Sequence, residues 1–427
     1  MKNVFTNRNF RLVFFGALVS EMGALLYSFA VSFYILEISG NNAFLQGLYL
    51  AVCGAVTLIM TPVGGVLGDR FNKAKIMFLC DYVRGGIIIA ATAMMLLFDH
   101  PQAHLIILFA VGVLGSAVGG VFSPASGALL PHIVEESQLQ QANSYYSIRG
   151  SLQGILGVVL AGVLYSALPI TTLFFLVGAC YVASGVSEMF IRYEHTAPEG
   201  RLTVKAALTD MKEGLVYMKT QKALTALMVT ILFINFFLSP VMGNFIPYFI
   251  KADVGGAPSY LFDKVLTPEL WLSVFEVLMG ISSLVGAAIL SAKPQADKCG
   301  RKVGLMILAM AGLMLALTAA YWVFVHTGVS LSAFLIALSV GSLVMGFVVT
   351  QVNIPINTAV MRIVDKRMLS KVSSIISVAS QGLVPIASVL AGAIIQGVGS
   401  TALLVFCTAG FAVATVFLLA NRHVKEI

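Results

Sequence analysis

The sequence predicts an all-α membrane protein with twelve transmembrane helices, arranged as two pseudo-symmetric halves of six helices each. Twelve apolar stretches are each long enough to cross a bilayer, which takes about 20 residues of helix. Of the 427 residues, 59% are hydrophobic and 11% are charged, which leaves too little polar surface to cover a soluble body of this size. Because a bilayer offers no water to the backbone, each crossing is expected to be helical.

The expected helices follow these apolar stretches in chain order. The first stretch is longer than the core of a signal peptide and no small-x-small cleavage site follows it, so we expect it to remain as a helix. The first half spans 10–36, 43–67, 76–98, 104–129, 145–168 and 171–191, and the second half spans 223–250, 269–292, 303–325, 330–354, 374–397 and 400–421.

The basic residues indicate the orientation. If the joints alternate between the two sides, one side holds 24 of the 26 Lys and Arg, leaving only Lys251 and Lys264 on the other. Positive residues in short loops stay in the cytosol, so both termini are expected there. These charges are spread over separate loops and do not form one patch with aromatic residues, so we expect the lipid bilayer and not a nucleic acid as the partner.

The longest cytosolic joint, 192–222, separates an N-terminal half, 1–191, from a C-terminal half, 223–427. Within this linker, apolar residues recur at helical spacing, which predicts an amphipathic helix on the inner membrane surface. The recurring residues are Val204, Leu208, Met211, Leu215 and Met218.

The two halves have weakly similar joints. Ser123-Pro124-Ala125 and Ile354-Pro355-Ile356 occupy corresponding places about 231 residues apart. The second-to-third and eighth-to-ninth joints are both short and basic. Paired halves are typical of alternating-access transporters. The simpler alternative is that any protein with many membrane helices has short basic joints.

The most distinctive local signal is the end of the second helix, from Gly64 to Lys75. It resembles the G-x-L-x-D-R-x-x-R/K signature of the major facilitator superfamily. Gly65 and Gly68 would permit close helix approach, and Asp69 could bond backbone N–H groups at a helix N-terminus. In that family the motif acts as a cytoplasmic latch, whose residues here are Gly65, Asp69, Arg70 and Lys73. The alternative is a tight turn followed by stop-transfer charges.

Weaker motifs in the same order resemble the drug-efflux branch of this family, including macrolide exporters and the enterobactin exporter. They are Asn9-Phe10-Arg11, Asp81-x-x-Arg84, Ser123-Pro124-Ala125 through Ala142-Asn143, and the segment from Asp210 to Tyr217. The resemblance implies a multi-pass protein of the bacterial plasma membrane that exports small amphipathic molecules, in exchange for protons and without a cofactor. We expect a monomer.

The fifth and fourth helices depart from the family pattern. Gly157 to Gly162 is similar to the antiporter motif G-P-x-x-A/G-G, but Val158 replaces the proline, which predicts that the usual kink is lost. The fourth helix lacks the embedded arginine of many proton-coupled relatives. It has Gly112, Gly115, Gly119 and Gly120 instead.

Two carboxyl groups lie deep in predicted helices: Glu21 near mid-membrane and Glu276 about seven residues from the outer face. A charge at the bilayer centre costs about 2.5–3.5 kcal/mol on insertion scales, unless the group is protonated, paired or hydrated. We therefore expect Glu21 first and Glu276 second to bind a proton or a cationic substrate. The alternative for both is a permanently neutral carboxyl bonded to a neighbouring helix.

Other polar residues in the helices are expected to serve structure or gating. Asp81 and Arg84 are one helical turn apart and predict a structural ion pair. Glu188 and Arg149 lie within a few turns of the cytosolic face, where side chains can snorkel or pair. Small, helix-breaking or polar residues suggest a gate or cavity: Gly23, Asn235, Pro240, Gly243 and Asn244.

Other functional classes are poorly supported. The sequence has no HExxH, GxSxG or CxxC, so we do not expect an enzyme, and it has no GxxxxGK[ST] phosphate loop for an ATP-driven pump. Four of its five Cys lie in apolar stretches, which argues against a disulfide framework or a metal site. A dedicated exporter of a siderophore, lipid or metabolite remains the main alternative, and a non-transporting receptor the weaker one.

Overall fold

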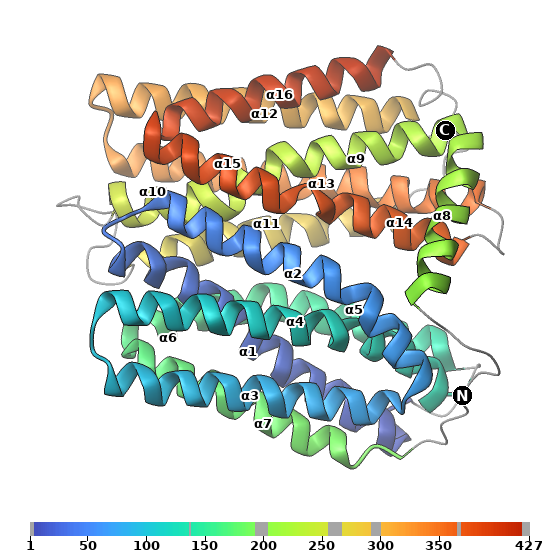
Figure 1. The fold of residues 1–427 in the computed structure, drawn as a ribbon. Coiled ribbons are helices and arrows are strands. Elements are labelled where there is room, and N and C mark those ends of the chain that lie inside the picture. The colour runs from blue at the N-terminus through green and yellow to red at the C-terminus, as the bar shows by residue number, and fades with distance from the viewer. Residues whose placement is uncertain are drawn as a thin grey trace. The chain divides into compact units, whose positions relative to one another are not determined.

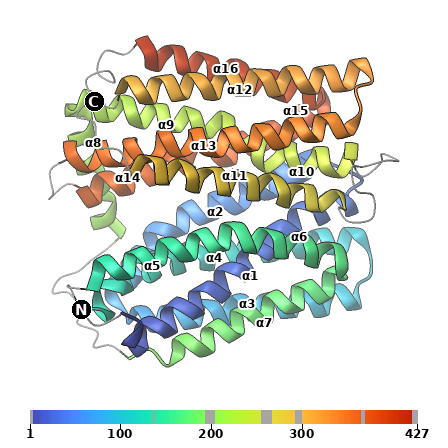
Figure 2. The same ribbon diagram turned by 180° about the vertical axis from the view of Figure 1, so that it is seen from behind.

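The computed structural model confirms the all-helical architecture (Figures 1 and 2). It describes residues 4–135, 138–192, 204–254, 267–291, 300–364 and 369–420. Within these ranges there is no strand, and 12 helices are long and apolar enough to cross a membrane. The twelve predicted crossings therefore exist.

The helices extend a few residues beyond most of the predicted spans. The first part of the chain forms η1 (Val4–Thr6), α1 (Arg8–Ile38), α2 (Ala43–Arg70), α3 (Lys73–Leu97), α4 (Pro101–Ile133), α5 (Leu139–Leu152), η3 (Gln153–Gly157), α6 (Val158–Ala167) and α7 (Ile170–Met189). The linker forms α8 (Val204–Thr220). The rest forms α9 (Lys222–Pro240), η4 (Val241–Phe245), α10 (Ile246–Phe249), η5 (Ile250–Val254), α11 (Pro268–Ser291), α12 (Gly300–Thr327), α13 (Leu331–Ile363), α14 (Leu369–Gly382), α15 (Val384–Gly397) and α16 (Ser400–Ala420).

The contacts between residues divide the chain into two units. The first comprises residues 1–40 and 52–207, and the second comprises 41–51 and 208–427. The boundary near residue 207 falls inside α8 and not at either end of the linker. The first turns of α2 contact the second unit because Gly47 and Gly392 let α2 and α15 approach closely, and the Ala43 N–H donates to Gln396 Oε1 at 3.1 Å.

The start of α1 is held by two asparagines. Asn7 caps the helix by accepting from the N–H groups of Asn9 and Phe10. Asn9 then bonds reciprocally with the backbone of Arg192 just after α7: its amide donates to the Arg192 carbonyl, and its Oδ1 accepts from the Arg192 N–H at 3.1 Å. The Asn9-Phe10-Arg11 motif therefore ties the first helix of the unit to the end of its last helix.

Small residues set the tight packing of α3, α7 and α1, which run side by side in the first unit (Figure 2). A Cβ at Gly85 of α3 would lie 2.8 Å from Val182 Cγ2 and 3.0 Å from the Gly178 carbonyl oxygen. On the α1 side, a Cβ at Gly23 would lie 3.2 Å from Cys180 Cβ of α7. Because lipid provides no hydrophobic force between helices, such close backbone contacts hold the helices together.

The close contact between α2 and α4 is made by glycines that differ in part from those expected from the sequence. Close approach occurs at Gly64, where a Cβ would lie 2.5 Å from the Gly120 carbonyl oxygen, and at Gly68, beside Ala125. At Gly65 no described atom lies within 4 Å of such a Cβ. The prediction that Gly65 permits close packing is therefore wrong for the first unit, because Gly64 points at α4 in its place.

The fifth and seventh crossings are both interrupted. The loss of proline at Val158 does not give a regular helix, because the π-helical segment η3 separates α5 from α6. The crossing therefore departs from α-helical geometry directly before Val158, while the loss of the kink stays a prediction. The seventh crossing changes to π-helical geometry at Val241, directly after Pro240, and again from Ile250 to Val254.

Neighbouring glycines in α3 allow a direct test of the packing between α3 and α7. We predict that Gly85→Ala lowers the thermal midpoint in detergent, because overpacking against Val182 and the Gly178 carbonyl costs about 1–3 kcal/mol. Gly86→Ala is the matched control, since a Cβ there meets no described atom within 4 Å. It is expected to leave the midpoint unchanged or slightly raised through helix propensity. Equal midpoints for the two variants would contradict this account.

Candidate functional site

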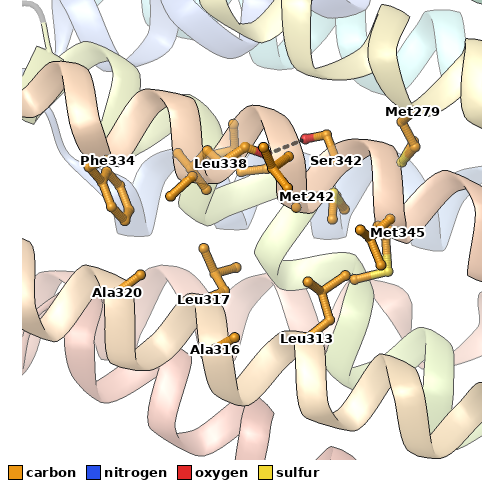
Figure 3. A pocket seen from close by; sticks show the side chains of 15 residues that line it. Met242, Met279, Leu313, Ala316, Leu317, Ala320, Phe334, Leu338, Ser342 and Met345 are labelled. Atoms are coloured by element: carbon orange, nitrogen blue, oxygen red, sulfur yellow. Dashed lines mark hydrogen bonds between the residues drawn. The ribbon is translucent and has the colours of Figure 1, made fainter.

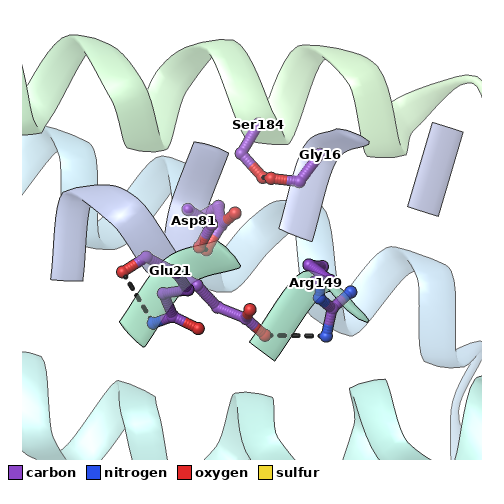
Figure 4. A network of polar contacts seen from close by, with 7 residues as sticks. Gly16, Glu21, Asp81, Arg149 and Ser184 are labelled. Carbon is purple, nitrogen blue, oxygen red and sulfur yellow. Dashed lines mark hydrogen bonds and ion pairs between the residues drawn. The ribbon is translucent and has the colours of Figure 1, made fainter. Parts of the chain in front are cut away.

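The first unit contains an ion pair inside its helices (Figure 4). Arg149 of α5 donates from Nη2 to Glu21 Oε1 of α1 at 2.8 Å. The Arg149 side chain is 10% exposed and that of Glu21 is 30% exposed, so Glu21 is less enclosed than its partner. A charge-assisted hydrogen bond of this length is strong, and it compensates a carboxylate that would otherwise be costly at this depth.

The local structure directs Arg149 toward α1. Its guanidinium carbon lies 4.4 Å from the centroid of the Tyr146 ring, one turn earlier in α5. Directly after α5, the Gln153 amide donates to the Glu21 backbone carbonyl at 3.2 Å, at the start of the π-helical segment. Sequence reasoning treated Arg149 as a charge near the cytosolic face. The structure instead makes it the direct partner of Glu21.

A second charged pair lies on α3. Asp81 is fully buried, and its Oδ1 lies 3.8 Å from Arg84 Nη1 and accepts from Ser20 Oγ of α1 at 3.2 Å. Arg84 also lies over the rings of Phe122 and Tyr181. These contacts place Asp81 and Arg84 together, as their one-turn spacing predicts.

The glycines of α4 explain how Arg84 is accommodated. A Cβ at Gly119 would lie 2.6 Å from Arg84 Nη2. The fourth helix has no arginine of its own in this part of the sequence, but Gly119 leaves the space into which α3 extends one. The first unit therefore still has a guanidinium beside α4.

Glu188 of α7 is the third buried carboxyl group of this unit. It is 0% exposed, and neither of its carboxyl oxygens has a hydrogen-bond partner among the described residues. A Cβ at Gly16 of α1 would lie 3.2 Å from Glu188 Cγ. The nearby Ser184 hydroxyl donates to the Gly16 carbonyl at 2.8 Å and so serves the backbone of α1. Glu188 is thus enclosed and unpaired, where sequence reasoning expected a snorkelling or paired charge.

The second unit contains an apolar cavity of about 410 Å³ (Figure 3). Its wall comes from η4, α10, α11, α12 and α13 and includes three methionines, Met242, Met279 and Met345. The one hydroxyl in the lining, that of Ser342, donates to the Leu338 carbonyl of its own helix. The volume is in the range typical of small-molecule sites, and the flexible thioethers of methionine adapt to different apolar shapes.

The other candidate residues of the second unit lie outside this lining. Glu276 is half-buried in α11 and makes no ion pair with a described residue. The Asn235 amide donates to the Ile231 carbonyl of its own helix. Pro240 ends α9, Gly243 lies within η4 beside Leu50, and Asn244 donates to the Ser388 carbonyl at 3.4 Å.

The remaining candidates are in the first unit. Gly23 contacts α7, as described above. Gly157 packs against α1, since a Cβ there would lie 2.8 Å from Met22 Sδ, and Gly162 is buried in α6. In the latch motif, Arg70 is exposed at the end of α2 and Lys73 is buried at the start of α3, but the side chain of Asp69 lies outside the described part.

Sequence reasoning did not foresee the link between Arg149 and Glu21 or the enclosure of Glu188. One available signal is that Gly178, Gly185, Ser184 and Glu188 all belong to α7, whose small residues mark a closely packed helix. Among the described residues, no group of three or more His, Cys, Asp and Glu is arranged to hold a metal ion. Charged side chains from α1, α3, α5 and α7 thus lie within the first unit.

Comparison with known proteins agrees with this architecture. The sequence profile of the Major Facilitator Superfamily matches residues 13–381. The uncharacterized MFS-type transporter YkuC of Bacillus subtilis (strain 168) is 24% identical over 383 residues, covering 87% of this chain and 82% of YkuC. Macrolide efflux protein A of Streptococcus pyogenes is 22% identical over 287 residues, covering 66% of this chain and 67% of that protein.

Solved structures share the fold at low sequence identity. A bacterial homologue of the iron transporter ferroportin, in an inward-facing state, has a TM-score of 0.74 at 15% identity, covering 96% of this chain and 98% of that chain. A POT family transporter in complex with 5-aminolevulinic acid has a TM-score of 0.74 at 13% identity, covering 97% and 96%. The profile match, the twelve membrane helices and these shared folds show that the chain belongs to the Major Facilitator Superfamily of membrane transporters.

Proposed function

We propose that this transporter exports amphipathic organic compounds, of drug or macrolide-like character, in exchange for protons. The observation that carries the proposal is the Glu21–Arg149 ion pair, which combines a membrane-embedded carboxylate with partial exposure. Such a carboxylate can lose its arginine partner to a proton or to a cationic substrate, because each would compensate the same charge.

Two further observations support the substrate class. The apolar, methionine-bearing cavity of the second unit suits the apolar body of an amphipathic molecule. Macrolide efflux protein A, which is named for macrolide efflux, is among the relatives of this chain. In this proposal the halves, 1–191 and 223–427, alternate between two states in the bacterial plasma membrane, with both termini in the cytosol.

The motif between α2 and α3 would contribute to this alternation. We propose that Asp69, Arg70 and Lys73 form a cytoplasmic latch that exists in only one of the two states. The basis is the sequence match, together with the position of Arg70 at the end of α2 and Lys73 at the start of α3. Gly68, which lies beside Ala125, holds this end of α2 close to α4.

A transport assay with Glu21→Gln tests the proposed exchange. In proteoliposomes with an imposed pH gradient, we predict that this variant loses gradient-driven accumulation of ethidium or of a radiolabelled macrolide by at least about tenfold, equivalent to ~1.4 kcal/mol. Glutamine keeps an oxygen that can accept from Arg149, so the fold is retained, but it can no longer exchange a proton. An internal pH dye measures proton movement in the same vesicles.

Glu37→Gln is the matched control, because Glu37 is an exposed carboxyl on the same helix and accepts from the Tyr165 hydroxyl at 3.3 Å. It is expected to transport like the wild type. Undiminished accumulation in Glu21→Gln would remove Glu21 from the mechanism. If the wild type moves neither probe but exports a siderophore, a lipid or a metabolite, the dedicated exporter is the correct alternative.

The cavity of the second unit is tested by filling it. Gly341 of α13 lines the cavity, and a Cβ there would come no closer than 4.0 Å to its nearest described neighbour, Leu313. We predict that Gly341→Leu raises the KM for a macrolide about tenfold, because the added side chain takes up space in the cavity. A tenfold change corresponds to ~1.4 kcal/mol of binding free energy. The rise in KM for ethidium is expected to be smaller. The thermal midpoint is expected to be unchanged or raised, since the side chain fills empty space.

The matched control is Gly312→Leu in α12. A Cβ at Gly312 meets no described atom within 4 Å, and Gly312 does not line the cavity. Its KM values are expected to equal those of the wild type. An identical KM in Gly341→Leu would show that the substrate does not enter this cavity.

A further inference from the structure

The enclosure of Glu188 makes it different from every other carboxyl group described above. It has no exposed surface, and both oxygens lack hydrogen-bond partners in the described part of the chain. The hydroxyls nearest in sequence are committed elsewhere: Ser184 donates to the Gly16 carbonyl and Ser187 to the Leu12 carbonyl at 3.1 Å. An ionised carboxylate without donors is strongly unfavourable in an apolar interior.

The charges that act electrostatically on Glu188 come from three helices. α3 contributes Asp81 and Arg84, and α5 contributes Arg149; α1 adds Glu21 through its pair with Arg149. The other titratable groups near it are Cys80 of α3 and Tyr146 of α5. α6, which also packs against α7, has no charged residue.

These charges do not balance if every group is ionised. The cluster has three carboxyl groups, Glu21, Asp81 and Glu188, against two guanidinium groups, Arg84 and Arg149. Arg84 lies beside Asp81 and Arg149 is bonded to Glu21, which leaves Glu188 as the uncompensated group. The cluster becomes neutral when one proton resides on Glu188.

The structure also contains a means of releasing that proton. Arg149 uses only Nη2 on Glu21, while its Nε and Nη1 are buried and have no partner among the described residues. A guanidinium with two unused donors can serve a second carboxylate. When Glu21 is neutralised by a proton or a bound cation, the positive charge of Arg149 becomes available to Glu188.

We propose that Glu188 is a proton-binding residue of the first unit, and that it releases its proton when Arg149 is freed from Glu21. In this step the O–H bond of the Glu188 carboxyl breaks, the proton passes to water, and the remaining carboxylate is compensated by Arg149. The transport role of this step rests on the proposed proton exchange, but the link between Glu21 and Glu188 does not depend on any substrate.

Infrared difference spectroscopy of the purified, reconstituted protein tests the proposal without transport. A protonated carboxyl has a C=O stretching band that a carboxylate lacks, and the band of Glu188 is identified as the one missing from Glu188→Gln. At neutral pH we predict that the wild type has this band. The same comparison is then made between Glu21→Gln and the double variant Glu21→Gln/Glu188→Gln. We expect no Glu188 band in Glu21→Gln, because the two guanidinium groups are then balanced by the two remaining carboxylates, Asp81 and Glu188.

Glu276→Gln, which removes a carboxyl of the second unit, is the control and is expected to retain the Glu188 band. The proposal is overturned if Glu188→Gln removes no carboxylic band at neutral pH, or if the band persists unchanged in Glu21→Gln. A buried glutamic acid with a purely structural role would give that second result. Glutamine resembles the neutral acid in shape, so the thermal midpoint of Glu188→Gln is expected to match that of the wild type at neutral pH and to exceed it at alkaline pH.

The outcomes for this proposal and for the proposed function are separable. If the Glu188 band behaves as predicted but Glu21→Gln still accumulates substrate in a pH gradient, proton exchange through Glu21 is refuted and the link between the two glutamates stands. If Glu21→Gln abolishes accumulation while the Glu188 band does not respond, the proposed function stands and the link is refuted.

Discussion

The compensation of buried charge is the constraint on which the first unit depends. Its helices lie in a medium that cannot solvate ions, and yet they contain Glu21, Asp81, Arg84, Arg149 and Glu188 in their interior. The cost of each charge is met by a neighbour on another helix or one turn away, or, as we propose for Glu188, by protonation. In the proposed mechanism, a conformational change in this unit would have to conserve or exchange these partners, and this would tie movement of the helices to movement of protons or cations.

The two units divide the chemistry between them. The first provides ionisable groups, held in place by close contacts at Gly85 and Gly119 that would be lost with any larger side chain. The second provides an apolar cavity beside a crossing whose backbone changes to π-helical geometry after Pro240.

Much of the fold could be predicted from the sequence, because twelve apolar stretches of sufficient length admit only helices in a bilayer. The site was less accessible. The pairing of Asp81 with Arg84 follows from their spacing, whereas the pairing of Arg149 with Glu21 joins residues 128 positions apart and depends on how α5 meets α1. The π-helical segment from Gln153 to Gly157 was not predicted, because no proline marks it in the sequence. Gly65 was chosen over Gly64 because a motif does not specify which of two adjacent residues faces the neighbouring helix.

The most direct measurement of the central claim is a double-mutant cycle on the stability of the reconstituted protein, with Glu21→Gln, Arg149→Gln and the two combined. If these groups compensate one another, each single change breaks the ion pair and the double change removes both partners. The account predicts a coupling energy of about 1–3 kcal/mol, within the range for residues in direct contact. Additive effects, with a coupling energy within about 0.3 kcal/mol of zero, would contradict it.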